Sequence, residues 1–286
     1  MVSDVDFGPW GLGYKLVTRR LGAMKPPAIL ELARMQQIER ALFTSHPARM
    51  DRGLRIPGDF LPFNEQELRT VMGTLAQRRA PGPDNITNEI LKLVYQHSPH
   101  LLLDMYNECL AAGVFPTRWK LARLVLITKK QGDPDNPSTY RPLCKLGTAG
   151  KVLERLIRTR LQAVMEHAGG LSPRQNGFRR GRSNADTRRE VCEPVTRAED
   201  HNHYSRRIVL LVTLGVRNAF NSARWVDILN ALEHSFLVPP YLLRMIDYLG
   251  NRSIKYDTKQ GRCNDKVTVW VCPRIYFRTG FLEHPI

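Results

Sequence analysis

The sequence predicts a mixed α/β fold, because segments with apolar residues at helical spacing are interrupted by two strand-like runs. These runs are Ala122–Thr128 and Ile208–Leu214. A chain of 286 residues, 42% of them hydrophobic, can bury the core of one large domain or two ordinary ones. No apolar run approaches the ~20 residues that a membrane-spanning helix needs, so we expect no membrane partner.

Four helices are predicted before residue 113. Apolar residues recur at helical spacing from Pro27 to Leu42. Asn64 followed by Glu67 is a capping-box pattern, and it predicts a helix that continues to Leu75. A loop with two prolines and a glycine then ends this helix, since proline and glycine do not continue a helix. The loop and the two helices expected after it span residues 79–84, 87–96 and 99–112.

The spacing of apolar residues changes from helical to strand-like at residue 122. The strand Ala122–Thr128 ends at Lys129 and Lys130, and a polar loop leads back to Tyr140, so we expect a hairpin with a basic tip. The helix expected next, over 151–164, has one apolar face. Its other face is basic and is expected to be solvated; the residues there are Lys151, Arg155, Arg158 and Arg160.

The rest of the chain is predicted to alternate between helix and strand. A polar helical stretch follows Ser183, and the uncharged run Ile208–Leu214 is expected to form a fully buried strand. Two more helices are predicted, over 222–232 and 240–249.

Positive charge is concentrated in the middle of the chain. The net charge is +16, and Arg118–Arg189 holds 17 basic and 5 acidic residues, a net +12 within 72 residues. Such a concentration favours a polyphosphate partner, since each neutralised phosphate releases counterions. A merely solubilising surface is the alternative.

The cysteines indicate a reducing compartment. They number five and show no Cys-x-x-Cys spacing, so we expect free thiols, no disulfide partner and no zinc: Cys109, Cys144, Cys192, Cys263 and Cys272. The N-terminus has neither a basic start nor an apolar core, so it does not predict a secretory signal.

Four motifs in order carry a family resemblance. They are R-A-P-G-P-D at 79–84, K-K to Y-R-P-L at 129–143, Q-N-G-F-R with G-R-S at 175–183, and V-R-N-A-F-N at 216–221. The chain resembles the reverse transcriptase of non-long-terminal-repeat retrotransposons, most closely the type-1 elements that insert into arthropod ribosomal DNA. The resemblance implies a right-hand polymerase fold, here fingers plus a partial palm, truncated before the catalytic turn.

The resemblance also implies roles for individual residues. Nucleotide-binding residues are expected at Lys129, Lys130, Arg141 and Phe220, and template-binding residues at Gln175, Arg179, Arg180 and Arg182. A lysine or an arginine fork at a hairpin tip can hold phosphate oxygens. The implied partners are an RNA template, a DNA primer and deoxynucleotides. A surface lysine pair and a core phenylalanine are the alternatives for Lys129–Lys130 and Phe220.

The sequence departs from the family at the catalytic metal site. The intact family holds two Mg²⁺ ions on carboxylates, but Gly215 occupies the position of the first of these Asp residues. The Tyr-Ala-Asp-Asp turn that supplies the others does not occur in this sequence. We therefore expect no intact catalytic residue, no metal site and no cofactor in this chain.

The C-terminal residues are expected to be a frameshift product. Permitted codons for Arg274–His284, read one base later, give G-S-I-L-G-P-D-F-W-N-I, which resembles a family segment. The predicted organisation is then an N-terminal helical extension (1–63), fingers with a basic template and nucleotide surface (64–206), a partial palm (207–268) and a frameshifted tail (269–286).

The function predicted is that of a retrotransposon-derived reverse transcriptase fragment, catalytically inactive by itself. Two alternatives remain at this point: a non-catalytic RNA- or DNA-binding module that uses the basic residues of 118–189, or a poorly folded pseudogene product. A nuclear location is expected from the family.

Overall fold

The computed structural model describes residues 30–43, 60–77, 79, 81–129, 133, 135–177, 179, 181–199, 208–215, 224–246 and 252–267. Predictions that fall elsewhere lie outside the described residues, and these include Lys130, Arg180, Phe220 and the tail 269–286 with Cys272.

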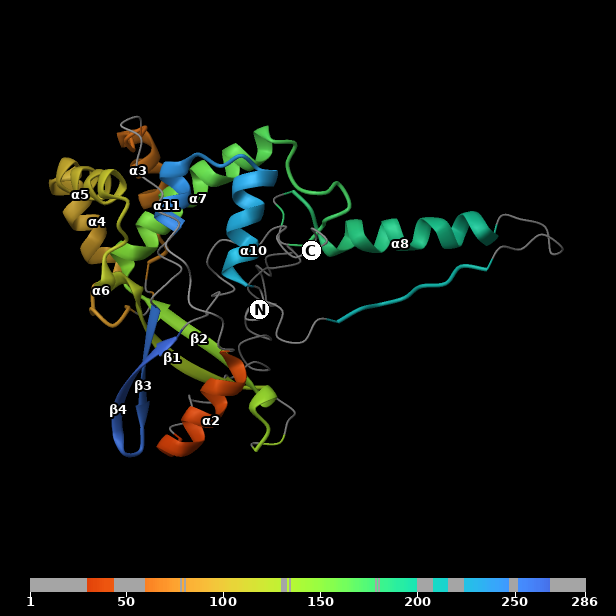
Figure 1. The fold of residues 1–286 in the computed structure, drawn as a ribbon, viewed down its shortest axis with the longest axis horizontal. Helices are drawn as coiled ribbons and strands as arrows, with labels where there is room; N and C mark the ends of the chain where they lie inside the picture. Colours follow the sequence, from red (N-terminus) through yellow and green to blue (C-terminus); the bar gives the residue numbers. More distant parts are fainter. Residues whose placement is uncertain are drawn as a thin grey trace, which may run out of the picture.

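Helices dominate the described chain (Figure 1). They are α2 (Leu32–Leu42), α3 (Glu65–Gly73), α4 (Asn88–His97), α5 (Pro99–Ala112), α6 (Thr117–Lys120), α7 (Thr148–His167), α8 (Asn184–Glu199), α10 (Trp225–Asn230) and α11 (Pro240–Met245). Short turns of 3-10 and π geometry are η1 (Pro137–Thr139) and η2 (Ala231–Ser235). The strands are β1 (Leu121–Thr128), β2 (Tyr140–Leu146), β3 (Arg252–Thr258) and β4 (Gly261–Val267). Among the described helices, none has the length and apolar character needed to traverse a bilayer.

The strands form one sheet in the order β2-β1-β3-β4. β1 and β2 pair antiparallel from Thr128↔Tyr140 to Ala122↔Leu146, which confirms the predicted hairpin. β3 runs parallel to β1 and antiparallel to β4. Residues assigned from the sequence to a partial palm therefore share a sheet with the hairpin assigned from the sequence to the fingers.

Local signals explain most of the helices. In α3 the Asn64 side chain accepts from the Glu67 amide at 2.9 Å, and the Glu67 carboxylate accepts from the Asn64 amide at 2.9 Å, so the predicted capping box is confirmed. Predictions of α4, α5, α7 and α8 are also confirmed. The helix expected over 222–232 is shorter and passes into the π turn η2.

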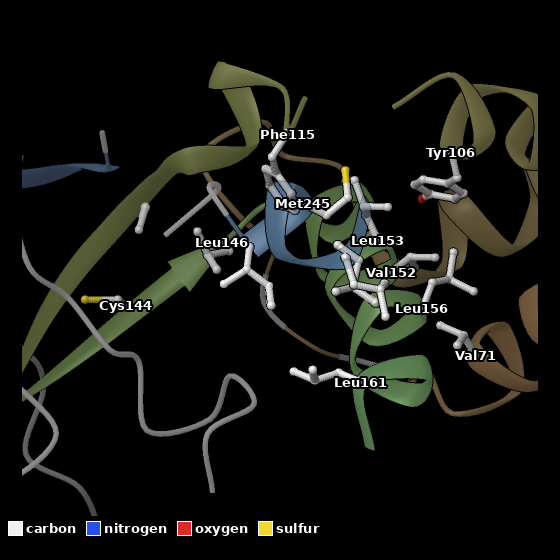
Figure 2. Packing of buried hydrophobic residues seen from close by; sticks show 14 of the residues in the cluster. Val71, Tyr106, Phe115, Cys144, Leu146, Val152, Leu153, Leu156, Leu161 and Met245 are labelled. Carbon is white, nitrogen blue, oxygen red and sulfur yellow. The ribbon is translucent and has the colours of Figure 1, made fainter. Parts of the chain in front are cut away.

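The core lies around α7 (Figure 2). Its apolar face, which includes Val152, Leu153 and Leu156, packs among side chains from α3, α5 and α11 such as Val71, Tyr106 and Met245. Full burial of a leucine-sized side chain contributes about 1.5–3 kcal/mol, so this face holds the helical layer together. Cys144 and Leu146 bring the buried face of β2 into the same core.

Two sequence predictions about burial are wrong. The run Ile208–Leu214 is extended but is not a strand of the sheet, and Ile208 is 96% exposed. Its apolar character predicted a strand, but β3 takes the position parallel to β1 in this sheet. Arg160, predicted to be solvated, is only 8% exposed because Glu67 and two backbone carbonyls surround its guanidinium.

Candidate nucleic-acid interface

The strand register places basic side chains on one face of the sheet. Residues opposite each other in adjacent strands share a face, and the face alternates along each strand. The pairs Arg123↔Lys145, Val125↔Leu143 and Ile127↔Arg141 therefore lie together. All six side chains are exposed or half-buried, whereas those on the other face, such as Leu124 and Leu146, are buried.

β3 extends this face by a third strand. Lys255 lies beside Arg123 in the parallel register, and it alternates with buried Ile254 and Tyr256. We call this surface the outer sheet face, with described residues Arg123, Val125, Ile127, Arg141, Leu143, Lys145, Ser253, Lys255 and Asp257. Asp257 is the one carboxylate among these residues, and its Oδ2 lies 2.6 Å from the Arg123 guanidinium. The remaining cations therefore give the outer sheet face a net positive charge.

The hairpin tip places Lys129 at one end of the outer sheet face. Lys129 directly follows the last residue of β1, and Arg141 is the second residue of β2, so both lie at the tip of the hairpin. Its amide donates to the Thr139 carbonyl at 2.8 Å, and its ammonium group donates to the Ser138 carbonyl. The structure thus brings together Lys129 and Arg141, two of the predicted nucleotide-binding residues.

The predicted template loop is folded against the start of α8. Asn176 is buried, and its amide donates to the Glu190 carboxylate at 2.8 Å. Gln175 is also buried at 8% exposure, and its amide donates to the Gly177 carbonyl at 3.4 Å. The carbonyl oxygens of both side chains have no hydrogen-bond partner among the described residues.

The two described arginines of this loop differ in their contacts. Arg179 donates to the Ser172 carbonyl at 2.9 Å, which fastens the loop across seven residues. Arg182 is exposed and next to Gly181, whose φ of 75° suits glycine. Ser183 directly precedes α8 and stabilises its first turn. Its amide and its hydroxyl both donate to the Asp186 carboxylate, at 2.7 and 2.8 Å. The hydrogen bonds from Ser183 lower the pKa of Asp186.

Not every positive charge of the 118–189 region is free to bind a partner. Arg160 pairs with Glu67, Arg155 donates to the Thr74 hydroxyl at 2.6 Å, and Arg123 pairs with Asp257. Arg141 and Arg182 are exposed, and Lys145 is half-buried. The outer sheet face and the Arg182 loop therefore present part of the accessible charge, and the exposed residues Arg118, Arg158, Arg174, Arg188 and Arg189 present more of it.

The position of the expected catalytic carboxylate holds Gly215, at the end of the exposed run 208–215. Glycine offers no side-chain oxygen to a metal ion. Over the described parts of the chain, no three His, Cys, Asp or Glu side chains gather as a metal site would require. Within the described residues, the donor set at this position does not fit a pair of Mg²⁺ ions.

Sequence reasoning missed three cations of the outer sheet face. Arg123, Lys145 and Lys255 were not singled out, although the register of the hairpin and the alternation S-I-K-Y-D in β3 could have indicated them.

Comparison with known proteins supports the motif-based resemblance. At 32% identity over 193 residues, the chain is similar to the Retrovirus-related Pol polyprotein from type-1 retrotransposable element R1 of Bradysia coprophila, an alignment that covers 67% of the chain and 18% of that protein. At 28% identity over 222 residues it is similar to the probable RNA-directed DNA polymerase from transposon X-element of Drosophila melanogaster, covering 78% and 23%. The R2 polyprotein of Popillia japonica is 29% identical over 155 residues, covering 54% and 20%.

The chain spans about a fifth of the length of these curated relatives. No protein-family model matches it. The resemblance predicted from the four motifs is confirmed by these similarities: the chain is a relative of the reverse transcriptases of non-long-terminal-repeat retrotransposons.

Proposed function

We propose that the chain is a reverse transcriptase fragment that binds single-stranded RNA and nucleotide phosphates but does not polymerise by itself. One observation carries the proposal: the sheet register groups Arg141 and Lys145 on one accessible face, and exposed Lys129 follows the last residue of β1 at the tip of the same hairpin. The printed names of several relatives describe RNA-directed DNA polymerases, which act on an RNA template.

The outer sheet face suits a phosphate-bearing ligand for two reasons. The Arg141 guanidinium is a planar fork that can hold two phosphate oxygens, while Lys129 and Lys145 act as point charges. Half-buried Val125, Ile127 and Leu143 lie between the cations, so bases could contact apolar side chains while their phosphates meet charge. We propose the triphosphate near Lys129, Lys130 and Arg141, with Phe220 beneath the sugar.

We place the template strand towards the loop of Gln175, Arg179, Arg180 and Arg182. Arg182 is exposed, and Arg179 holds the loop closed through Ser172. Buried Gln175 would then shape the loop, and a contact from its carbonyl oxygen to the template would need local opening.

The proposed inactivity rests on Gly215 and on the absence of a Tyr-Ala-Asp-Asp sequence from this chain. Polymerases of the intact family hold Mg²⁺ on the Asp that Gly215 replaces here and on the two Asp residues of the Tyr-Ala-Asp-Asp turn. A nuclear location remains a proposal from the family, to be checked by imaging the tagged chain in cells.

The binding proposal is tested with a labelled single-stranded RNA of about 16 nucleotides, by fluorescence anisotropy across a salt titration. We expect affinity to fall as salt rises, with a log–log slope of about −0.7 per neutralised phosphate. Arg141→Ala should weaken binding about three- to tenfold and make the slope shallower by about 0.7. Arg69→Ala is the matched control, since Arg69 is exposed on α3, away from the sheet. Wild-type binding that ignores salt contradicts the proposal.

The inactivity proposal is tested by primer extension on an RNA template with Mg²⁺ or Mn²⁺. We expect no template-dependent incorporation, and Gly215→Asp alone should not restore it, because one carboxylate does not hold two ions. Incorporation by the purified wild-type chain would show that the catalytic part of the proposal is wrong.

A poorly folded pseudogene product is the second candidate, and the exposed apolar run Ile208–Leu214 favours it. Cooperative thermal unfolding, followed by circular dichroism, would exclude this candidate. A broad transition without cooperativity would support it.

A further inference from the structure

The Pro-Gly-Pro-Asp loop, a motif to which no function has been assigned above, contacts the start of α7. A Cβ atom on Gly82 would lie 2.5 Å from the Gly147 nitrogen and 2.6 Å from both the Gly147 Cα and the Leu146 carbonyl carbon. These are backbone atoms at distances that real side chains do not reach, so residue 82 must be glycine. The loop backbone therefore crosses directly over the junction between β2 and α7.

Asp84 places a carboxylate at the N-terminal end of α7. Its Oδ1 accepts from the Ile86 amide at 3.2 Å, and its Oδ2 lies 2.5 Å from the position of a Cβ on Gly147. Gly147 is the N-cap residue of this 20-residue helix, which has neither a capping side chain nor an acidic residue in its first turn. Helix N-termini carry unsatisfied amides and partial positive charge, which a carboxylate stabilises.

The first turn of α7 is also held by hydrogen bonds from other segments. Thr148, at 1% exposure, donates its hydroxyl to the Ile86 carbonyl at 2.8 Å. Tyr106 of α5 donates to the Ala149 carbonyl at 3.2 Å. A Cβ on Gly150 would lie 2.8 Å from the Cβ of Trp119, so glycine at this position lets Trp119 pack closely against the turn.

We propose that Asp84 is a positioning residue: it caps α7 from a distant loop and fixes the β2–α7 junction, so that the outer sheet face keeps a defined orientation against the helical layer. The capping role rests on the geometry alone. Its effect on RNA affinity rests on the proposed function.

The contact can be isolated with a double-mutant cycle. Gly147 has φ −59° and ψ 148°, which alanine adopts freely, and the three atoms nearest to its added Cβ all belong to the Asp84 carboxyl group. We expect Gly147→Ala and Asp84→Ala each to lower stability in urea unfolding. The double variant should be destabilised by less than the sum of the two single changes. In Gly147→Ala the new Cβ clashes with the Asp84 carboxyl group, and Asp84→Ala removes that group. Additive changes would overturn the proposal.

Amide hydrogen exchange, measured without nucleic acid, tests the cap directly. Asp84→Ala should speed exchange at residues 148–151 about five- to tenfold. Asp84→Asn, which keeps an acceptor for the Ile86 amide but replaces the negatively charged Oδ2 that faces α7 with an NH₂ donor, should restore little of the protection. Asp104→Ala is the matched control, since Asp104 is an exposed aspartate of α5. Unchanged exchange in Asp84→Ala would overturn the proposal.

RNA affinity separates positioning from direct contact. Removal of an acidic residue from a basic protein ordinarily strengthens RNA binding, whereas a positioning role predicts binding about threefold weaker in Asp84→Ala with an unchanged salt slope. If the wild type fails to bind RNA but Asp84→Ala still speeds exchange, the proposed function is wrong and the capping role stands. If RNA affinity changes without any change in exchange, Asp84 acts through the ligand and the capping role is wrong.

Discussion

Arg160 of α7 and Glu67 of α3 form a two-point ion pair, with Nε to Oε1 and Nη2 to Oε2 both at 2.8 Å. Nη2 also donates to the Pro62 carbonyl at 2.6 Å, and the guanidinium carbon lies 4.4 Å from the centre of the Phe63 ring. Glu67 also closes the capping box of α3. One guanidinium thus connects the start of α3 to the middle of α7.

Arg160→Ala should lower the free energy of unfolding by about 3 kcal/mol, because it leaves a half-desolvated carboxylate and two carbonyls without their donor. Arg160→Lys should recover only part of this loss, since an ammonium group lacks the planar fork. Urea denaturation measures both variants. Arg69→Ala, which removes the same charge from an exposed position, should change stability by less than about 0.5 kcal/mol. An equal effect of the two alanine variants would contradict the assignment.

A second buried pair should make stability depend on pH. Glu154 and Arg252 are 1% and 2% exposed, with 3.3 Å between Arg252 Nη2 and Glu154 Oε1. Burial raises the pKa of Glu154 to about 7, although Arg252 opposes this shift. The folded state then binds more protons than the unfolded state between pH 4.5 and 7, so this group's contribution to stability is full below pH 4.5 and is lost as pH rises to about 7.

Glu154→Gln removes this titration while keeping the shape of the protonated acid. We expect its unfolding free energy to match the wild type near pH 5 and to exceed it near pH 8, measured by urea unfolding across that range. The difference between the two proteins isolates Glu154 from all other titrating groups. A variant that is less stable than the wild type at pH 8 would mean that the ionised pair is the favoured form.

Leu237 adopts a left-handed backbone conformation, with φ 50°, which is strained for a residue other than glycine. Its side chain is 75% exposed, so packing does little to offset this strain. It follows the π turn η2, whose end is closed by the Val238 amide donating to the Leu232 carbonyl at 2.9 Å. Leu237→Gly should therefore raise the free energy of unfolding by about 0.5–1 kcal/mol, because glycine adopts this conformation without strain. Thermal unfolding measures the gain as a higher Tm.

The reverse change at a comparable helix end provides the control for Leu237→Gly. Gly113 ends α5 with φ 62°, and a Cβ there would lie 2.6 Å from the Arg244 Cδ. Gly113→Ala should destabilise the protein through both strain and contact. A Leu237→Gly variant that is less stable than the wild type would show that the leucine side chain contributes more than its exposure indicates.

Signals confined to a few residues predicted the structure well. The Asn64–Glu67 capping box depends on atoms three residues apart, and the hairpin from Ala122 to Tyr140 depends on one strand pattern and one loop. The positions of Lys129 and Arg141 at one tip follow from that same hairpin. Their placement together needed no knowledge of the rest of the chain.

Features that depend on distant partners were missed. The burial of Arg160 requires Glu67, 93 residues earlier, and the pattern of basic residues on α7 gives no sign of it. Lys255 reaches the outer sheet face only because β3 pairs with β1 across more than 120 residues. The exposure of Ile208–Leu214 was also missed, since hydrophobicity predicts a strand but not whether a neighbouring strand will pair with it.

Charged residues can replace the leucines of the exposed run Ile208–Leu214 without loss of packing. Leu210 and Leu214 are 84% and 91% exposed, so Leu210→Lys with Leu214→Lys should change the unfolding free energy by less than about 0.5 kcal/mol. The double variant should also resist aggregation on heating, as measured by light scattering, because lysine opposes strand pairing between chains. Leu124→Lys, at a β1 position that is 4% exposed, should abolish cooperative unfolding. A large loss of stability in the double variant would mean that the run packs against the rest of the chain in solution.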